Sequence, residues 1–105
     1  MSKRVLSIGY DAILLEDRHY LLRAAGCYVT SVLGKQELET LRDPALFDAV
    51  LIGSEVQDRI EILGWASKNA SPARVIVLPE DEDLTAALKE LKQEVGDLSR
   101  DTLHS

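Results

Sequence analysis

Two short, almost uninterrupted apolar runs constrain the fold of this chain more than any other feature of its sequence. Residues 47–52 read FDAVLI and residues 74–78 read RVIVL, and helix-like segments stand before and after each run. A strand that is apolar along its whole length is typical of a parallel sheet with helices on both faces. The two runs therefore predict an α/β protein.

The remaining elements alternate in the same way. Further strands are predicted at residues 4–8 and 27–33, and helices over 12–25, 35–42, from 54 or 55 to the NASP segment, and from about 84. Strands that alternate with helices of this length imply parallel pairing through right-handed crossovers. The simplest arrangement is a three-layer, flavodoxin-like sheet of four strands in the order 2-1-3-4, with no fifth strand.

The spacing of apolar residues predicts which helix faces are buried. A residue that packs on the sheet recurs every three or four positions along a helix. This rule selects one face of the first helix and one face of the third. Gly26 is expected to be the C′ residue of the first helix. The selected residues are Ile13, Leu14, Asp17, Leu21, Leu22 and Ala25 in the first helix, and Val56, Ile60, Leu63 and Ala66 in the third.

Composition narrows the possible functions. A chain of 105 residues is expected to form one domain, residues 1–105, in which 96–105 are a C-terminal tail or a helix extension. Its net charge of −6 argues against binding to nucleic acid or to an anionic membrane surface. The lone Cys27 excludes an internal disulfide and suits the cytoplasm. No apolar run approaches the ~20 residues of a membrane span.

The order of these segments resembles the receiver domain of two-component response regulators. LLRAAG at residues 21–26 runs directly into CYVTSV, as the family's first helix runs into its second strand. GKQELETL at 34–41 resembles the family's second helix, while FDAVLI and RVIVLP resemble its third and fourth strands. The resemblance extends from Lys3 to about Val95 and rests on the order and spacing of mostly apolar motifs.

The positions that carry the chemistry of receivers hold different residues in this chain. The resemblance places Gly9 and Tyr10 where the family has an acidic pair for Mg²⁺, and Gly53 where it has the phosphate-accepting Asp. Pro79 stands in place of the Thr or Ser that follows strand four. Phosphoryl transfer needs an oxygen nucleophile and a cation held by hard oxygen ligands. The resemblance thus implies a pseudo-receiver without metal or cofactor, whose vacated site we expect the Tyr10 ring to fill.

Two other interpretations of the strand ends are open. Gly9 could begin a phosphate-binding loop, but GYDAILLED matches neither glycine-rich nucleotide motif, and a tight turn explains the glycine. Acidic residues could converge there to hold a cation or to act as a catalytic carboxylate pair. Acids at helix N-termini, with Asp11 as a helix cap, are the favoured explanation. The acidic residues concerned are Asp11, Glu80, Asp81 and Asp83.

Four further residues have conceivable roles. His19 and His104 belong to no metal-spacing motif, and His19 is expected on the solvent face of the first helix. Cys27 is expected to be an inert, small apolar residue. Trp65 could be a hot spot for a partner, but packing against its own sheet is the favoured interpretation.

The last helix and the fourth strand predict an interface. The apolar residues from Leu84 to Leu98 are spaced 4-3-4-3, as in a heptad repeat. An ordinary helix that packs on its own sheet and ends at Gly96 would also produce most of this pattern. Without a fifth strand, strand four would also have an open apolar edge, which proteins normally cover. These surfaces predict a homodimer through Val75, Val77, Leu84, Leu88, Leu91, Val95 and Leu98.

Together these observations predict a cytoplasmic, non-catalytic receiver-like module that acts in two-component signalling through protein partners. The alternative is a flavodoxin-like domain that binds a small ligand, or catalyses a reaction, in the acidic crevice at the strand ends. A third possibility is that the chain is a fragment of a longer regulator.

Overall fold

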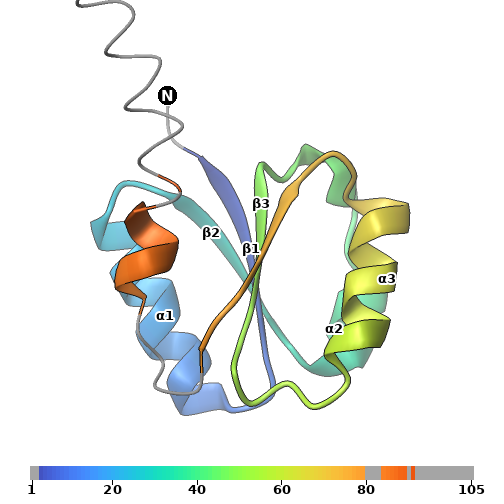
Figure 1. Ribbon diagram of the computed structural model, residues 1–105, viewed down its shortest axis with the longest axis horizontal. Coiled ribbons are helices and arrows are strands. Elements are labelled where there is room, and N and C mark those ends of the chain that lie inside the picture. Colours follow the sequence, from blue (N-terminus) through green and yellow to red (C-terminus); the bar gives the residue numbers. More distant parts are fainter. Residues whose placement is uncertain (1–2, 80–83, 90, 92–105) are drawn as a thin grey trace, which may run out of the picture.

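The computed structural model describes residues 3–79, 84–89 and 91 (Figure 1). Strands and helices alternate along the chain, and a short 3-10 turn precedes the third strand. Residues 85–89 are also helical. The elements are β1 (Arg4–Gly9), α1 (Ala12–Ala24), β2 (Tyr28–Leu33), α2 (Gly34–Glu39), η1 (Pro44–Leu46), β3 (Ala49–Ile52), α3 (Arg59–Asn69) and β4 (Arg74–Val77).

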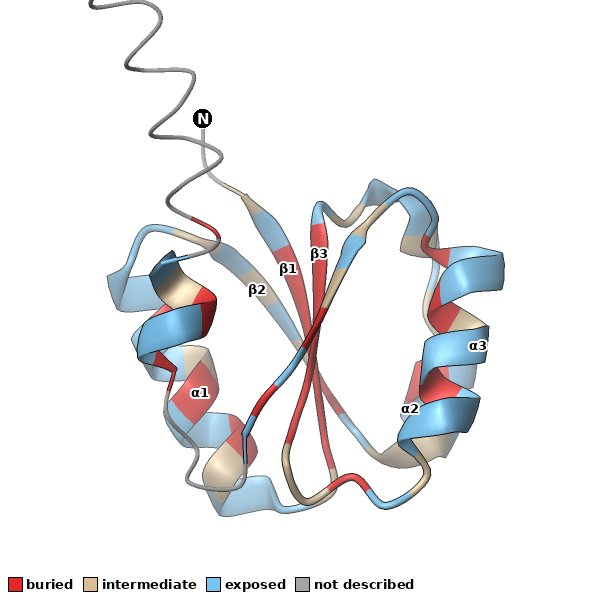
Figure 2. Cartoon of the chain, viewed as in Figure 1, coloured by how far each residue is buried: buried red, intermediate tan, exposed pale blue. Residues whose placement is uncertain are grey.

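The four strands form one all-parallel sheet in the order β2-β1-β3-β4, as the sequence predicts. Leu6 in β1 lies between Thr30 of β2 and Val50 of β3, which places β1 and β3 in the centre. Figure 2 shows these two strands largely buried, whereas the outer strands β2 and β4 carry exposed positions. Among the described residues, β2 and β4 are therefore the open edges of the sheet.

Helices cover both faces of the sheet, which makes three layers (Figure 1). On one face, β1 and β3 contribute Leu6, Ile8, Val50 and Ile52 to a core with α2 and α3. On the other face, α1 together with residues 84–89 and 91 packs over a second core. Its buried members are Val5, Leu22, Ala49, Leu51, Ile76, Leu78, Leu84, Ala87 and Leu91. None of the helices in the described ranges is long and apolar enough to cross a membrane.

The face that α1 turns to the sheet differs from the predicted one. The buried residues are Leu15, Arg18 and Leu22, whereas Ile13 and Leu21 are exposed. Residues 15, 18 and 22 share one helix face, but the arginine hides this stripe from a hydrophobicity pattern. Gly26 follows the helix with a φ of 93°, as expected of a C′ glycine.

The start of α3 was also predicted wrongly, and its buried face was predicted only in part. The helix begins at Arg59 rather than at residue 54 or 55, because residues 54–58 form turns after β3. Val56 and Ala66 are buried as predicted, whereas Ile60 is 86% exposed and Ile62 is buried in its place. The turns bring the side chains of Glu55 and Asp58 back towards the strand ends, where both are hydrogen-bonded.

The residues of the predicted interface occupy two environments. Val75 is half-buried and Val77 is 38% exposed on the edge strand β4. Leu84 and Leu91 are buried over the chain's own sheet and Leu88 packs beside them, as the ordinary amphipathic-helix interpretation expects. Val95 and Leu98 lie outside the described residues.

Candidate functional site

The candidate site lies where the central strands end. Gly9 is the last residue of β1, and Gly53 follows β3 directly. The Gly53 amide donates to the Ile8 carbonyl oxygen at 2.9 Å, so the two strand ends are adjacent. Both glycines are buried. In open parallel sheets, this carboxyl edge is the usual place for a ligand.

A buried ion pair occupies the space beside the two glycines. Arg18 reaches it from α1 with a side chain only 2% exposed, and its Nη2 lies 2.5 Å from Glu55 Oε1, whose side chain is 19% exposed. A Cβ added at Gly53 would lie 2.8 Å from Arg18 Cζ, and one at Gly9 would lie 2.9 Å from Glu55 Oε2. Any larger residue at either position would displace the pair. The expectation that the Tyr10 ring fills this space is therefore wrong.

Glu55 also binds the backbone where α1 begins. Its Oε2 accepts from the Tyr10 amide at 2.8 Å and from the Asp11 amide at 3.1 Å. Burial acts to raise the pKa of Glu55, but the Arg18 guanidinium and these two amides outweigh it, so that the pKa lies below its ordinary value. Glu55 is thus an ionised, fully engaged carboxylate.

Tyr10 joins a second polar network at the same edge. Its hydroxyl donates to Asp58 Oδ1 at 2.5 Å, and Lys35 Nζ lies 3.2 Å from Asp58 Oδ2 and also contacts Glu61. Burial and the bond to Asp58 raise the pKa of Tyr10 to about 12, while that bond lowers the pKa of Asp58. Tyr10 therefore links the end of β1 to α2 and α3 as a neutral donor.

Of the four acidic residues predicted near this edge, the structure describes only Asp11. Asp11 is the cap of α1, as expected, because its Oδ1 accepts from the Ile13 amide at 2.9 Å and the Leu14 amide at 3.2 Å. Pro79 is exposed after β4. Across residues 3–79, 84–89 and 91, no three His, Cys, Asp or Glu side chains are placed to hold a metal ion. Glu80, Asp81 and Asp83 lie outside these ranges.

The other singled-out residues have structural surroundings. His19 is half-buried rather than on the solvent face, with Nδ1 2.7 Å from Ser31 Oγ. Cys27 packs against the core beneath α1, and burial raises the pKa of its thiol, which favours the unreactive protonated form. Trp65 packs against the other core, as predicted. His104 lies outside the described residues.

The sequence interpretation missed both residues of the ion pair, Arg18 and Glu55, and also Asp58 of the second network. A weak signal for each member of the ion pair is present. Arg18 lies between Leu15 and Leu22 on what is otherwise an apolar helix face. Glu55 comes two positions after Gly53, in the loop that follows a buried strand. Neither signal identifies the other residue as its partner.

None of the family models, curated proteins or solved structures compared with this chain matches it. The resemblance to receivers therefore rests on the sequence motifs alone, and the strand order 2-1-3-4 shows a flavodoxin-like fold.

Proposed function

We propose that this chain is a receiver-like regulatory module that takes up no phosphate and acts through protein–protein contacts in the cytoplasm, within a bacterial-type signalling system. The observation that carries the proposal is the Arg18–Glu55 ion pair beside Gly53. It occupies the place where a receiver would need an acceptor carboxylate and the phosphoryl group that it receives.

The electrostatics of the ion pair support a permanently fixed site. Phosphorylation of a receiver adds negative charge that must be neutralised by a cation. Here the cation of Arg18 is already neutralised by Glu55, and Glu55 also holds the amides of Tyr10 and Asp11. A module with this arrangement would present one surface constantly and would depend on its partners for regulation.

The ion pair weighs against the alternative of a ligand-binding or enzymatic domain that uses the acidic crevice. Such a site needs room and convergent, available polar groups at the ends of β1 and β3. The oxygens of Glu55 are already engaged, and the space beside Gly9 and Gly53 contains side-chain atoms.

Assembly into a homodimer through β4 is part of the proposal. Arg74 N donates to the Asp48 carbonyl oxygen at 3.0 Å, so the alternating peptide groups of Val75 and Val77 face away from β3. Val77 adds an apolar side chain that is 38% exposed. An open apolar edge of this kind can pair with its own copy across a two-fold axis.

Incubation with acetyl phosphate and Mg²⁺, followed by intact-mass spectrometry, tests the missing phosphorylation. We expect no adduct on the wild-type chain or on Gly53→Asp, because the new carboxylate would have no metal ligands at Gly9 and Tyr10. A receiver that retains its acceptor Asp, treated in parallel, is the positive control. An adduct on any Asp of the wild type would refute the pseudo-receiver proposal, and efficient labelling of Gly53→Asp would refute the argument from the missing metal site.

Gel filtration coupled to light scattering tests the dimer. We expect a mass of twice 11.6 kDa at micromolar concentration. Val77→Lys should give the monomer, because it places a charge on the open edge. Ile60→Lys, a matched change at an exposed position of α3, should leave the dimer intact. A wild-type monomer would rule out assembly through β4.

A further inference from the structure

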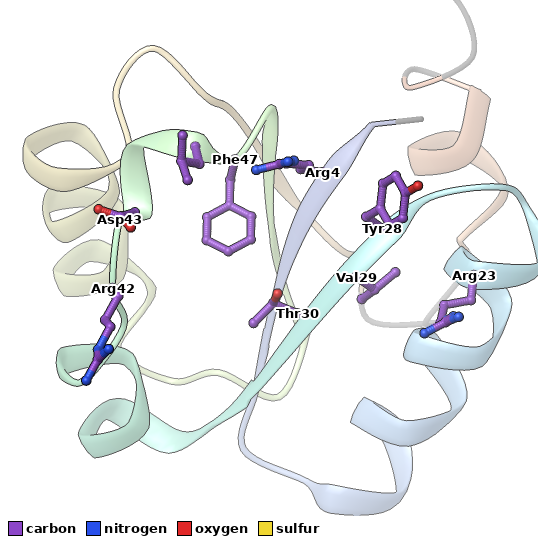
Figure 3. Close-up of a pocket in the computed structure, with 9 residues that line it drawn as sticks. Arg4, Arg23, Tyr28, Val29, Thr30, Arg42, Asp43 and Phe47 are labelled. Atoms are coloured by element: carbon purple, nitrogen blue, oxygen red, sulfur yellow. The ribbon is translucent and has the colours of Figure 1, made fainter. Parts of the chain in front are cut away.

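A groove of about 460 Å³ crosses the open edge of β2, at the end of the sheet away from the Arg18–Glu55 pair. Its apolar part includes Val29, Leu46 and Phe47. Figure 3 shows that three arginines surround it, each from a different part of the fold: Arg4 from β1, Arg23 from α1 and Arg42 from the segment after α2.

The charge of the groove is opposite to that of the whole chain. All three arginines are exposed, and no guanidinium among them has an ion-pair partner within the described part of the chain. Asp43 contributes the one carboxylate of the lining. A chain of net charge −6 thus presents a local excess of positive charge, which favours an anionic occupant.

The arrangement of the arginines favours an elongated occupant. In Figure 3, Arg42 and Arg23 lie at opposite sides of the groove, with Phe47 and Thr30 between them. Cations that converge on one point suit a compact anion such as a phosphate group. Cations that are spread around an apolar floor suit a chain that carries several carboxylates.

The backbone of β2 offers hydrogen bonds beside the same groove. Tyr28 N donates to the Lys3 carbonyl oxygen at 2.8 Å, so the peptide groups of Tyr28 face β1 and, by alternation, those of Val29 and Ser31 face outward. The next outward amide, that of Leu33, is already bound by the Glu37 carboxylate. The outward-facing peptide groups of β2 therefore begin within the basic groove, which Val29 lines, and continue to Ser31 beside it.

We propose that this groove binds an extended, acidic segment of a partner protein. The segment adds a strand to the edge of β2 at Val29 and Ser31, while its carboxylates pair with Arg4, Arg23 and Arg42. The inference rests on the proposed function, since it names the partner chemistry of a module that acts through protein contacts.

Fluorescence anisotropy with a labelled peptide of alternating Glu and Val tests the groove. We expect saturable binding that Arg23→Glu and Arg42→Glu each weaken about tenfold, the effect of losing one charge-assisted hydrogen bond. Arg59→Glu makes the same charge change at the start of α3, outside the groove, and should bind like the wild type. No binding by the wild type, or equal weakening by Arg59→Glu, would overturn the proposal.

Two further probes separate strand addition from simple anion binding. A peptide of the same sequence that is N-methylated at every residue keeps its charge but loses all of its backbone donors, and we expect it not to bind. Inorganic phosphate should not displace the parent peptide. Binding of the methylated peptide, or displacement by phosphate, would refute strand addition. None of these results bears on phosphorylation of the chain, so a failed groove and a failed pseudo-receiver proposal remain distinguishable.

Discussion

Replacement of Glu55 by Gln isolates the contribution of the ion pair to the stability of this fold. Gln keeps the size of Glu and retains an oxygen that can accept from the Tyr10 amide, which Glu55 now binds at 2.8 Å. What the substitution removes is the negative charge opposite Arg18, together with the second oxygen, which now accepts from Arg18 Nη2. The guanidinium, 2% exposed, would then be buried without a counter-charge.

The expected cost follows from the burial of the two partners. Removal of one member of a fully buried ion pair costs about 3–5 kcal/mol. The side chain of Glu55 is 19% exposed, so solvent reaches the pair and reduces this cost. We therefore expect a loss of about 2 kcal/mol, which lowers the Tm of a domain of this size by on the order of 10 °C.

Urea denaturation followed by the fluorescence of the single tryptophan, Trp65, measures this loss. Arg18→Met alone should cost less than Glu55→Gln, because Glu55 keeps both amide donors. The double variant should be more stable than the sum of the single losses predicts, with a coupling of about 1 kcal/mol or more. Strictly additive losses would show that the two charges do not stabilise each other.

Three other outcomes follow from the same contacts. The pKa of Glu55 lies below its ordinary value of 4.5, so the ion pair stabilises the fold above that pH, and this stabilisation is lost as pH falls through the folded-state pKa. Urea denaturation across a pH series should show this pH-dependent loss of stability in the wild type and not in Glu55→Gln. Tyr10→Phe should abolish the phenol titration near pH 12 in an absorbance titration, and a retained phase would refute the hydrogen bond to Asp58. Gly53→Ala should lower the free energy of unfolding by about 1–3 kcal/mol through overpacking, but by clearly less in a chain that also carries Arg18→Ala. Equal losses in the two chains would contradict the inference that a glycine at position 53 makes room for the Arg18 side chain.

The strand order of this fold was predictable because its signals are local or follow from a general rule. FDAVLI contains β3, which is buried along its whole length, and the equally apolar RVIVL contains β4, an edge strand in which Arg74 and Val77 are exposed. Gly26 and Asp11 mark the two ends of α1, since each satisfies backbone requirements within a few residues. Right-handed crossovers then restrict the order of four parallel strands to few arrangements.

The helix faces and the candidate site were not predictable from such local signals. A periodicity rule assigns Arg18 to solvent, because burial of a guanidinium is favourable only when a counter-charge meets it. That counter-charge is Glu55, 37 residues away along the chain. The late start of α3 has a related cause, since residues 54–58 form turns in which Glu55 and Asp58 contact the end of β1.

The glycines and the ion pair at the strand ends depend on one another. An Asp at position 53 would bring its Cβ against Arg18 and a second carboxylate close to Glu55, so an acceptor Asp and this ion pair cannot share the space. A side chain at position 9 would collide with the same two groups. The glycine at position 53 and the pairing of Arg18 with Glu55 are thus two aspects of one packing arrangement. Phosphoryl transfer to a carboxylate at this edge would require removal of the ion pair together with new oxygen ligands at positions 9, 10 and 53, which no single substitution can achieve.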